Sequence, residues 1–425
     1  MKTRALLSLA CAAALPLAAC GDDAIPDPPG RMVRSSLERE QNPSVPPADA
    51  ADLVAGNTAF AVDMFHQLRA ADENLFFSPH SISIALAMTY AGARTETELQ
   101  MADALDFRLP QARLHPAFDQ LDLALGSRGQ GASGKDGQPF RLRIANALFG
   151  QEGYAFLPDY LDTLALNYGA GLSLFDFTTE AESARQAING WVEDATEGRI
   201  PELLAEGVIT PQTVLVLTNA VYFNASWANP FEPSATQAGT FHAPAGDISA
   251  QMMRGTEEML YGAGAGYQAV GIPYDGDELD MVVVLPDQGG FDDFAVDLDG
   301  AGLQAIFAGL QGASVNLTLP RFELRSKAEL VPAFKALGMV DAFGDADFSG
   351  MDGTRSLFIQ EIVHEAFVAV DEAGTEAAAA TAVVVGRTSA PAEQATVVVD
   401  RPFLVFIRDR ATGAVVFAGQ IVNPS

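Results

Sequence analysis

The stretch from Gly374 to Ala390 contains no proline, and Pro391 follows it directly. Proline is excluded from the centre of a β-sheet because it lacks the backbone N–H that the strand ladder needs. Thr381 and the valines at 383–385 favour a strand over a helix, and Gly374 allows the backbone to turn where the stretch begins. An alanine-rich helix or a low-complexity linker is the alternative interpretation. We favour a loop whose composition suits the middle of a sheet.

Alternate side chains of a strand point to the same face of a sheet. One face of this stretch is small and uncharged and consists of Thr375, Ala377, Ala379, Thr381 and Val383. The other face carries Glu376, Ala378, Ala380, Ala382 and Val384. The first face could enter a packed core without a steric clash or a buried charge, and Glu376 would then lie on the outer face. We therefore expect that the segment can be inserted into a sheet as a strand.

The N-terminal residues are typical of an export signal. Lys2 and Arg4 precede an apolar stretch, residues 5–19, that is too short to span a bilayer as a helix. The stretch ends in Leu17-Ala18-Ala19-Cys20, which resembles the lipobox of bacterial lipoproteins. This resemblance implies a signal peptide over residues 1–19, lipidation of Cys20, and an exported protein anchored to the bacterial membrane, facing the periplasm or the cell surface. A plain signal peptide that happens to contain Cys20 is the alternative.

Residues 20–50 are expected to form a flexible tether behind the lipidated cysteine. Apolar residues are sparse there, and prolines at positions 26, 28, 29, 43, 46 and 47 interrupt any helix. From Asp52 onward, the spacing of apolar residues predicts an amphipathic helix.

No second linker follows, so we predict a single domain over residues 51–425 in which helices and strands are interleaved. Helices are expected at 183–197 and 331–337, and buried strands at 281–285 and 404–407. Residues 126–139 are rich in glycine and polar residues, which predicts a mobile surface loop.

The charge excludes one class of partner. The chain carries 25 Lys and Arg residues against 55 Asp and Glu residues, a formal net charge of −30. Removal of residues 1–19 takes away two basic residues and no acidic ones, which leaves 23 against 55 and a net charge of −32. A field of this sign repels phosphate backbones, so nucleic acid is not expected as a partner. The only cysteines, Cys11 and Cys20, cannot form a disulfide within the mature chain, so a large core must stabilise it.

The sequence lacks the motifs of common enzyme classes. The five histidines form no His-Glu-x-x-His zinc motif; they are His66, His80, His115, His242 and His364. There is neither a Gly-x-Ser-x-Gly elbow nor a Walker-type phosphate loop. We therefore predict that the chain is not an enzyme and that it holds no metal and no cofactor.

The sequence Gly374-Thr375-Glu376-Ala377-Ala378-Ala379-Ala380-Thr381 resembles the hinge of inhibitory serpins. Other segments are similar to serpin motifs and occur in the order of the family; they are residues 74–82, 188–192 with 196–200, 217–223 followed by Trp227, 346–350 and 400–407. The resemblance covers the chain from about residue 52 to residue 425. It implies the serpin fold, an α+β arrangement of three β-sheets surrounded by about nine helices, with an exposed reactive-centre loop.

The resemblance also implies a mechanism. A serine protease would attack the loop and form its acyl-enzyme, and insertion of the loop into the main sheet, an established case of strand addition, would trap the protease in a covalent complex. No residue of the inhibitor would be catalytic, and the chain would act as a monomer. By position, a polar cluster under the centre of the sheet would control its opening, with Trp227 near the top, where the hinge enters; the cluster residues are Ser78, Ser81, Asn219 and His364. These side chains are equally consistent with ordinary buried polar groups that bond one another.

The bait bond is expected at Thr388-Ser389, counted from Glu372 by the spacing of the family. Arg387-Thr388 is the alternative, because Arg387 is the only basic residue between Gly374 and Asp400 and would suit the acidic pocket of a trypsin-like enzyme. Thr388 would instead suit the small apolar pocket of an elastase or a subtilisin. Residues 389–402 are a few more than is usual in the family, which leaves the register open.

A non-inhibitory serpin that serves as a surface-binding or structural lipoprotein is the second interpretation of function. Such serpins tend to carry charged residues, bulky residues or proline in the hinge. The hinge of this chain is made mostly of alanine and threonine, which favours the inhibitor.

Overall fold

The computed structural model describes residues 25–135, 137–375 and 394–425. The predicted lipidation site, Cys20, lies outside the described residues. So do most of the hinge, Glu376 to Thr381, and the candidate bait positions Arg387, Thr388 and Ser389. Within the described part, ten α-helices and sixteen strands form one α+β fold with two hydrogen-bonded sheets, so the predicted fold class is confirmed.

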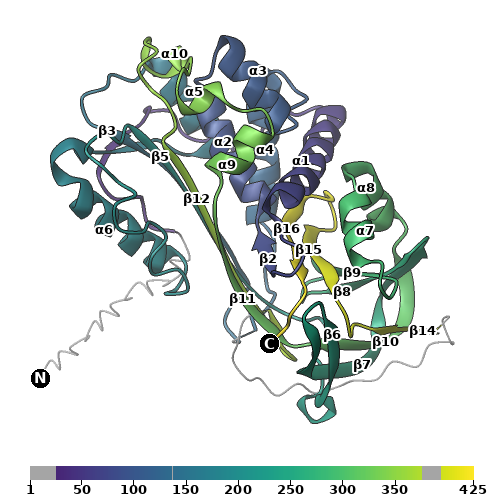
Figure 1. The fold of residues 1–425 in the computed structure, drawn as a ribbon. Coiled ribbons are helices and arrows are strands. Elements are labelled where there is room, and N and C mark those ends of the chain that lie inside the picture. The colour runs from purple at the N-terminus through teal and green to yellow at the C-terminus, as the bar shows by residue number, and fades with distance from the viewer. Residues whose placement is uncertain (1–24, 136, 376–393) are drawn as a thin grey trace, which may run out of the picture.

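The main sheet has seven strands, and the longest of them run nearly side by side through the molecule (Figure 1). Their order is β1 (Arg31–Val33), β4 (Leu172–Phe175), β3 (Arg141–Gln151), β5 (Leu215–Ser226), β13 (Gly374–Thr375), β12 (Glu361–Val370) and β11 (Phe322–Glu329). The central strands β5 and β12 are parallel to each other and buried along almost their whole length. Burial on both faces explains why these two segments are mostly apolar and do not alternate between apolar and polar residues.

The second sheet has nine strands. They are β14 (Gln394–Val398), β10 (Gln311–Pro320), β7 (Gly246–Gly264), β8 (Tyr267–Pro273), β9 (Leu279–Pro286), β15 (Phe403–Asp409), β16 (Val415–Ile421) and β2 (Leu75–Phe77), with β6 (Gln237–Ala243) paired to β7. The long β7 pairs with β6 and β10 along most of its length and with β8 at its end. The three sheets of the prediction therefore correspond to the main sheet and to two sections of this sheet that β7 joins. The predicted strands 281–285 and 404–407 are confirmed as the adjacent β9 and β15.

Most helices gather at one end of the main sheet (Figure 1). This group consists of α1 (Pro47–Leu68), α2 (Pro79–Tyr90), α3 (Thr95–Ala104), α4 (Gln111–Gly126), α5 (Pro158–Tyr168), α9 (Val331–Ala336) and α10 (Ser349–Asp352). Helix α6 (Phe177–Ala195) covers the opposite face of the main sheet, and α7 (Phe291–Asp297) and α8 (Gly300–Ala308) lie beside the second sheet (Figure 1). None of the described helices combines the length and the apolar character that crossing a bilayer demands.

Helix α2 lies at the centre of the fold. It contacts β3 and β5 of the main sheet on one side and β16 of the second sheet on the other. Every residue of this helix is buried, so it has no polar face, and its serines and histidine need partners inside the protein. This position makes α2 the support on which the middle of the main sheet rests.

The predicted tether is wrong for the described residues 25–46, which pack along the domain. Residues 31–33 form β1, an antiparallel edge strand on β4, and the indole N–H of Trp191 donates to the carbonyl of Pro26 at 2.7 Å. Arg39 then pairs with Asp119 and Asp122, both at 2.7 Å. Prolines exclude a helix here but do not prevent an extended chain from pairing at a sheet edge, where unused backbone groups are available.

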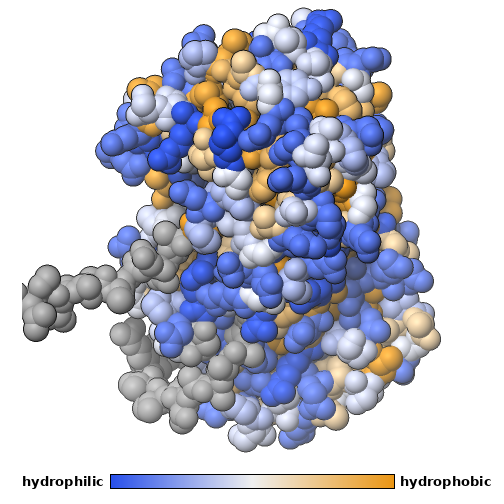
Figure 2. Space-filling view, turned by 90° about the vertical axis from the view of Figure 1, so that its left-hand side faces the viewer, coloured by the Kyte–Doolittle hydropathy of each residue, from blue (hydrophilic) through white to orange (hydrophobic). Residues whose placement is uncertain are grey.

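The glycine-rich loop is also more ordered than predicted. Helix α4 continues to Gly126, and the residues that follow fold over the end of the main sheet where β13 lies. Ser133 accepts a hydrogen bond from the backbone of Ser226 at 3.0 Å, and Lys135 is buried. The face of the molecule that carries α6 is mostly hydrophilic, with hydrophobic residues concentrated at the end opposite to β13 (Figure 2).

The ion pair of Arg39 yields a stability prediction. The side chain of Asp119 is fully buried, so Arg39→Met leaves a buried carboxylate unpaired and should lower the free energy of unfolding by about 3 kcal/mol. Arg31→Met is the matched control, because its partner Glu152 is exposed and the loss should stay below about 1 kcal/mol. Urea unfolding followed by tryptophan fluorescence measures both. Equal stabilities of the two variants and the wild type would show that the N-terminal segment does not hold the domain together.

Candidate functional site

The first two hinge residues are already part of the main sheet. Gly374 and Thr375 form β13, which pairs with Ser226 and Ala225 of β5 and, through Thr375, with Val370 of β12. A Cβ atom on Gly374 would lie 2.1 Å from the carbonyl oxygen of Ala225. Only glycine fits this close approach of two backbones, which explains the residue at the head of the hinge.

Thr375 has the orientation that the alternation of the hinge predicts. Its side chain is fully buried, and its hydroxyl lies 2.7 Å from the hydroxyl of Tyr274 in the core. Because side chains alternate along a strand, every second position after Thr375 would also face the core if the strand continued. The small, uncharged face of the hinge is therefore the face that is directed inward at its one described member.

The turn that precedes β13 is fixed by several contacts. The backbone N–H of Asp371 donates to the carbonyl of Gly374 at 3.0 Å, which closes the turn. Arg321 forms an ion pair with Glu372, with Nε 2.8 Å from Oε1. The indole N–H of Trp227 donates to the carbonyl of Asp371 at 2.9 Å, and its ring stacks on Tyr274 with centroids 4.8 Å apart. Trp227 thus lies where the hinge joins the sheet, apart from the other predicted cluster residues.

The other four predicted residues come together under the middle of the main sheet. The side-chain amide of Asn219 donates to the hydroxyl of Ser81 at 2.5 Å and contacts Nδ1 of His364 through its oxygen. Nε2 of His364 accepts a hydrogen bond from the backbone N–H of Ser78 at 3.1 Å. The hydroxyl of Ser78 donates to the carbonyl of Val416 at 2.7 Å. The cluster therefore links β5 and β12 to α2 and, through α2, to the second sheet.

Asn146 is a fifth member that the sequence analysis missed. It lies on β3 directly opposite Asn219, and His364 lies opposite Asn219 on β12, so the three form one row across the sheet. Oδ1 of Asn146 accepts from Asn219 at 2.7 Å and from Ser81 at 2.8 Å. A single amide within the otherwise apolar sequence Ile144-Ala145-Asn146-Ala147-Leu148 was the available signal.

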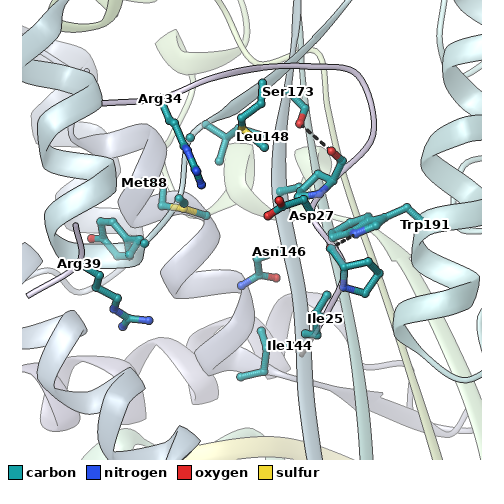
Figure 3. A pocket seen from close by; sticks show the side chains of 18 of the residues that line it. Ile25, Asp27, Arg34, Arg39, Met88, Ile144, Asn146, Leu148, Ser173 and Trp191 are labelled. Atoms are coloured by element: carbon teal, nitrogen blue, oxygen red, sulfur yellow. Dashed lines mark hydrogen bonds between the residues drawn. The ribbon is translucent and has the colours of Figure 1, made fainter. Parts of the chain in front are cut away.

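The cluster also borders a cavity of about 410 Å³ between β3, the helical layer and the N-terminal segment. Asn146 lines this cavity, and Figure 3 shows its side chain at the centre with Asp27 and Arg34 above it. The N-terminal segment is held over the cavity by the hydrogen bonds from Trp191 to Pro26 and from Ser173 to Pro28 (Figure 3). The central row of the sheet is therefore covered, on the side of β3, by the segment that the sequence predicted as a tether.

Burial keeps the histidine of the cluster neutral. His364 is 1 % exposed, and burial lowers its pKa from 6.5 to about 3, although the contact with Asn219 acts in the opposite direction. A neutral imidazole has one nitrogen that donates and one that accepts. Since Nε2 accepts from Ser78, Nδ1 carries the proton and donates to Asn219, which fixes the direction of the central hydrogen bond.

Comparison with known proteins gives one consistent family. A family profile described as "Serpin (serine protease inhibitor)" matches residues 55–424. The leukocyte elastase inhibitor of Sus scrofa is 38 % identical over 393 residues, which is 88 % of this chain and 99 % of that protein. An uncharacterized serpin-like protein of Thermococcus kodakarensis is 37 % identical over 368 residues, 86 % of this chain and 84 % of that protein.

A solved structure has the same fold. The native state of the thermophilic serpin tengpin superposes with a TM-score of 0.80 and 26 % sequence identity, covering 92 % of this chain and 100 % of that chain. The matching family profile describes inhibitors of proteases and not enzymes. This agrees with the prediction that the chain is not an enzyme.

The low pKa of His364 predicts how stability depends on pH. The unfolded chain takes up this proton near pH 6.5, whereas the folded chain resists it until about pH 3, so the free energy of unfolding should fall as the pH drops through this window. His364→Gln removes this contribution, and its curve should fall less steeply, by up to about 1.4 kcal/mol per pH unit. His80 and His115, whose pKa values burial also lowers, are present in both proteins and cancel. Parallel curves for wild type and variant, measured by urea unfolding between pH 7 and pH 4, would contradict the prediction.

Proposed function

Because the chain belongs to the serpin family, we propose that it inhibits serine proteases as a single-use trap, in which cleavage of the bait bond lets the hinge insert into the main sheet. The observation that carries the proposal is β13. Its two residues already occupy the head of a gap between β5 and β12, in the antiparallel direction that an inserted strand needs. The enzyme would supply all of the chemistry, and the inhibitor would supply the strand.

The register of β13 indicates the path that an inserted strand would follow. Thr375 lies opposite Ala225 and Val370, so continued pairing would bring Thr381 opposite Asn219 on β5 and His364 on β12. Those two residues are themselves a register pair in the closed sheet. Insertion would therefore separate Asn219 from His364, and the hydroxyl of Thr381 could replace the contact that each of them loses. These replacement hydrogen bonds would explain why position 381 of the hinge holds a threonine.

The energetics favour insertion once the loop is cut. Positions 376–385 would face residues 224–215 of β5, and the direct pairing of β5 with β12 from Val216–Glu361 to Val221–Ala366 would be lost. At about 1 kcal/mol for each additional backbone hydrogen bond, the net gain is on the order of 10–15 kcal/mol. That is comparable to the stability of a typical domain, roughly 5–15 kcal/mol. At ~3.3 Å per residue, these ten inserted residues would extend over roughly 33 Å.

We propose an elastase-like or subtilisin-like protease as the target, because Thr388 has a small side chain and the valines at 383–385 offer apolar flanking contacts. The similarity to a leukocyte elastase inhibitor supports this choice. Arg387 keeps a trypsin-like enzyme as the alternative.

We also propose that the protein is exported and held at a bacterial membrane by a lipid on Cys20, on the basis of the lipobox-like residues 17–20. It would then act as a monomeric inhibitor in the periplasm or at the cell surface. A surface lipoprotein that merely binds its partner would have the same anchor, so the anchor by itself does not identify the activity.

Trapping is tested by incubation with elastase, subtilisin and trypsin. An inhibitor gives an adduct with at least one protease that survives SDS, whereas a non-inhibitory serpin gives only cleaved loop. Thr381→Arg should abolish the adduct while cleavage continues, because an unpaired guanidinium cannot enter the core beside His364. Thr381→Ser is the matched control and should keep the adduct, since it retains a small hydroxyl. An unchanged ratio of adduct to cleaved product in Thr381→Arg would show that this face does not insert.

The bait bond is located by mass spectrometry of the released C-terminal peptide. A peptide that begins at Ser389 is expected, and one that begins at Thr388 would identify Arg387 as the bait. Arg387→Ala should leave inhibition of elastase intact within about twofold if Thr388 is the bait. A peptide that begins beyond Pro391 would exclude both positions.

Lipidation is tested by metabolic labelling of the expressing bacterium with a fatty-acid analogue. The wild type should be labelled and Cys20→Ser should not. Equal labelling of the two proteins would overturn the assignment of Cys20, whatever the trapping assay shows.

A further inference from the structure

The gap ahead of the hinge is short and well defined. The direct pairing of β5 with β12 ends at Val221 and Ala366, and β13 pairs with both strands from Ala225 and Val370 onward. Between these points, residues 222–224 of β5 and 367–369 of β12 have no strand between them among the described residues. Any strand that inserts must pass this point first.

Lys135 bridges this gap. Its backbone N–H donates to the side-chain oxygen of Asn224 on β5 at 2.8 Å. Its ammonium group lies 3.4 Å from the carbonyl oxygen of Ala369 on β12 and 2.8 Å from Oδ2 of Asp371. The side chain is only 1 % exposed, although lysine is rarely buried without a specific partner. One residue thus contacts both of the strands that insertion must separate further.

The loop that carries Lys135 is fixed to the same region. Ser226 donates its backbone N–H to the carbonyl of Ser133 at 3.0 Å and its hydroxyl to the carbonyl of Gly134 at 2.9 Å. The backbone N–H of Ser133 in turn donates to Asp275 at 2.9 Å. These bonds hold the backbone of Ser133 and Gly134 at the end of β5, so the residue that follows them enters the gap from a fixed position.

The contact with Ala369 has a particular significance for insertion. In an antiparallel ladder, opposed residues alternate between hydrogen-bonded and non-hydrogen-bonded pairs. Asp371 and Gly374 are hydrogen-bonded across the turn. The next pair, Val370 and Thr375, is therefore a non-hydrogen-bonded pair. The next hydrogen-bonded pair would be made by Ala369. The carbonyl oxygen of Ala369 is the ladder acceptor of that pair, and the ammonium of Lys135 lies 3.4 Å from the same oxygen.

We propose that Lys135 is a positioning residue that restrains the hinge, by tying β5 to β12 through Asn224, Ala369 and Asp371, until cleavage of the bait bond makes the full insertion available. The proposal rests on the proposed function in so far as it concerns loop insertion. The ion pair between Lys135 and Asp371 would then control the rate at which the sheet opens. The pair of Lys135 with Asp371, whose side chain is 31 % exposed, can break when Asp371 returns to water.

The test uses Lys135→Met, which keeps the apolar stem and removes the charge. The full-length protein is incubated with a fluorescent peptide of the hinge sequence, residues 374–385, and uptake is followed by native gel. Lys135→Met should take up the peptide about tenfold faster than the wild type, which corresponds to about 1.4 kcal/mol in the barrier, and Lys135→Arg should stay near the wild-type rate. Lys327→Met is the matched control, because this lysine is exposed and its ammonium donates to the carbonyl of Glu202, outside the gap.

A second measurement is independent of the loop. Hydrogen exchange of the backbone amides at 222–224 and 367–369 should become about tenfold faster in Lys135→Met, and it should be unchanged in Lys327→Met. Unchanged exchange in Lys135→Met, or equal acceleration in both variants, would overturn the role of Lys135. A wild type that forms no protease adduct, takes up no peptide and yet shows the faster exchange in Lys135→Met would overturn the proposed function and leave the restraint standing.

Discussion

Direct pairing of β5 with β12 keeps the main sheet closed, and it extends over only part of the two strands. Toward the hinge, the two strands are connected by β13 and by the contacts of Lys135 instead. At the centre they are connected by the hydrogen bond between Asn219 and His364. These are polar contacts that an incoming strand can replace with contacts of the same kind. Apolar interdigitation across the same boundary would have to be broken without replacement.

The polar row in the middle of the sheet has a second effect. Asn219 and His364 are each 1 % exposed, and buried polar groups without partners are costly. They are satisfied when the sheet is closed, and they would be satisfied again when a strand with a hydroxyl lies between them. A sheet that opened without a strand would remove the bond between them, and Oδ1 of Asn219 and Nδ1 of His364 would each lose a partner. If the hinge inserts as proposed, the row would disfavour the partly opened state and leave two favoured states, closed and filled.

The sequence predicted the positions of the candidate site residues best where a pattern repeats along the chain. The alternation of the hinge correctly placed Thr375 against the core, and the serpin-like segments placed Ser78, Ser81, Asn219 and His364 in one cluster. Asn146 contacts Asn219, which lies 73 positions further along the chain, and Lys135 contacts Asn224, which lies 89 positions further. No local pattern encodes such contacts. A lysine in a glycine-rich segment is normally solvated, and its burial follows only from where that loop folds.

The prediction of a tether for the N-terminal segment was wrong for a related reason. Proline content reports which hydrogen bonds a chain cannot make, and it does not report whether a sheet edge is available nearby. The edge of β4 lies more than 100 residues further along the sequence.

Packing of this segment has a geometric consequence for a lipid-anchored chain. Four residues lie between Cys20 and Ile25, the first described residue, and the five Cα–Cα steps of this stretch cover at most about 18 Å. The backbone at Pro26 is bound to Trp191 on α6, so a lipid on Cys20 would keep that side of the domain within about 20 Å of the bilayer surface. The molecule would then have a preferred orientation instead of swinging on a tether of thirty residues. Its reach toward a protease would be set by the height of the domain itself.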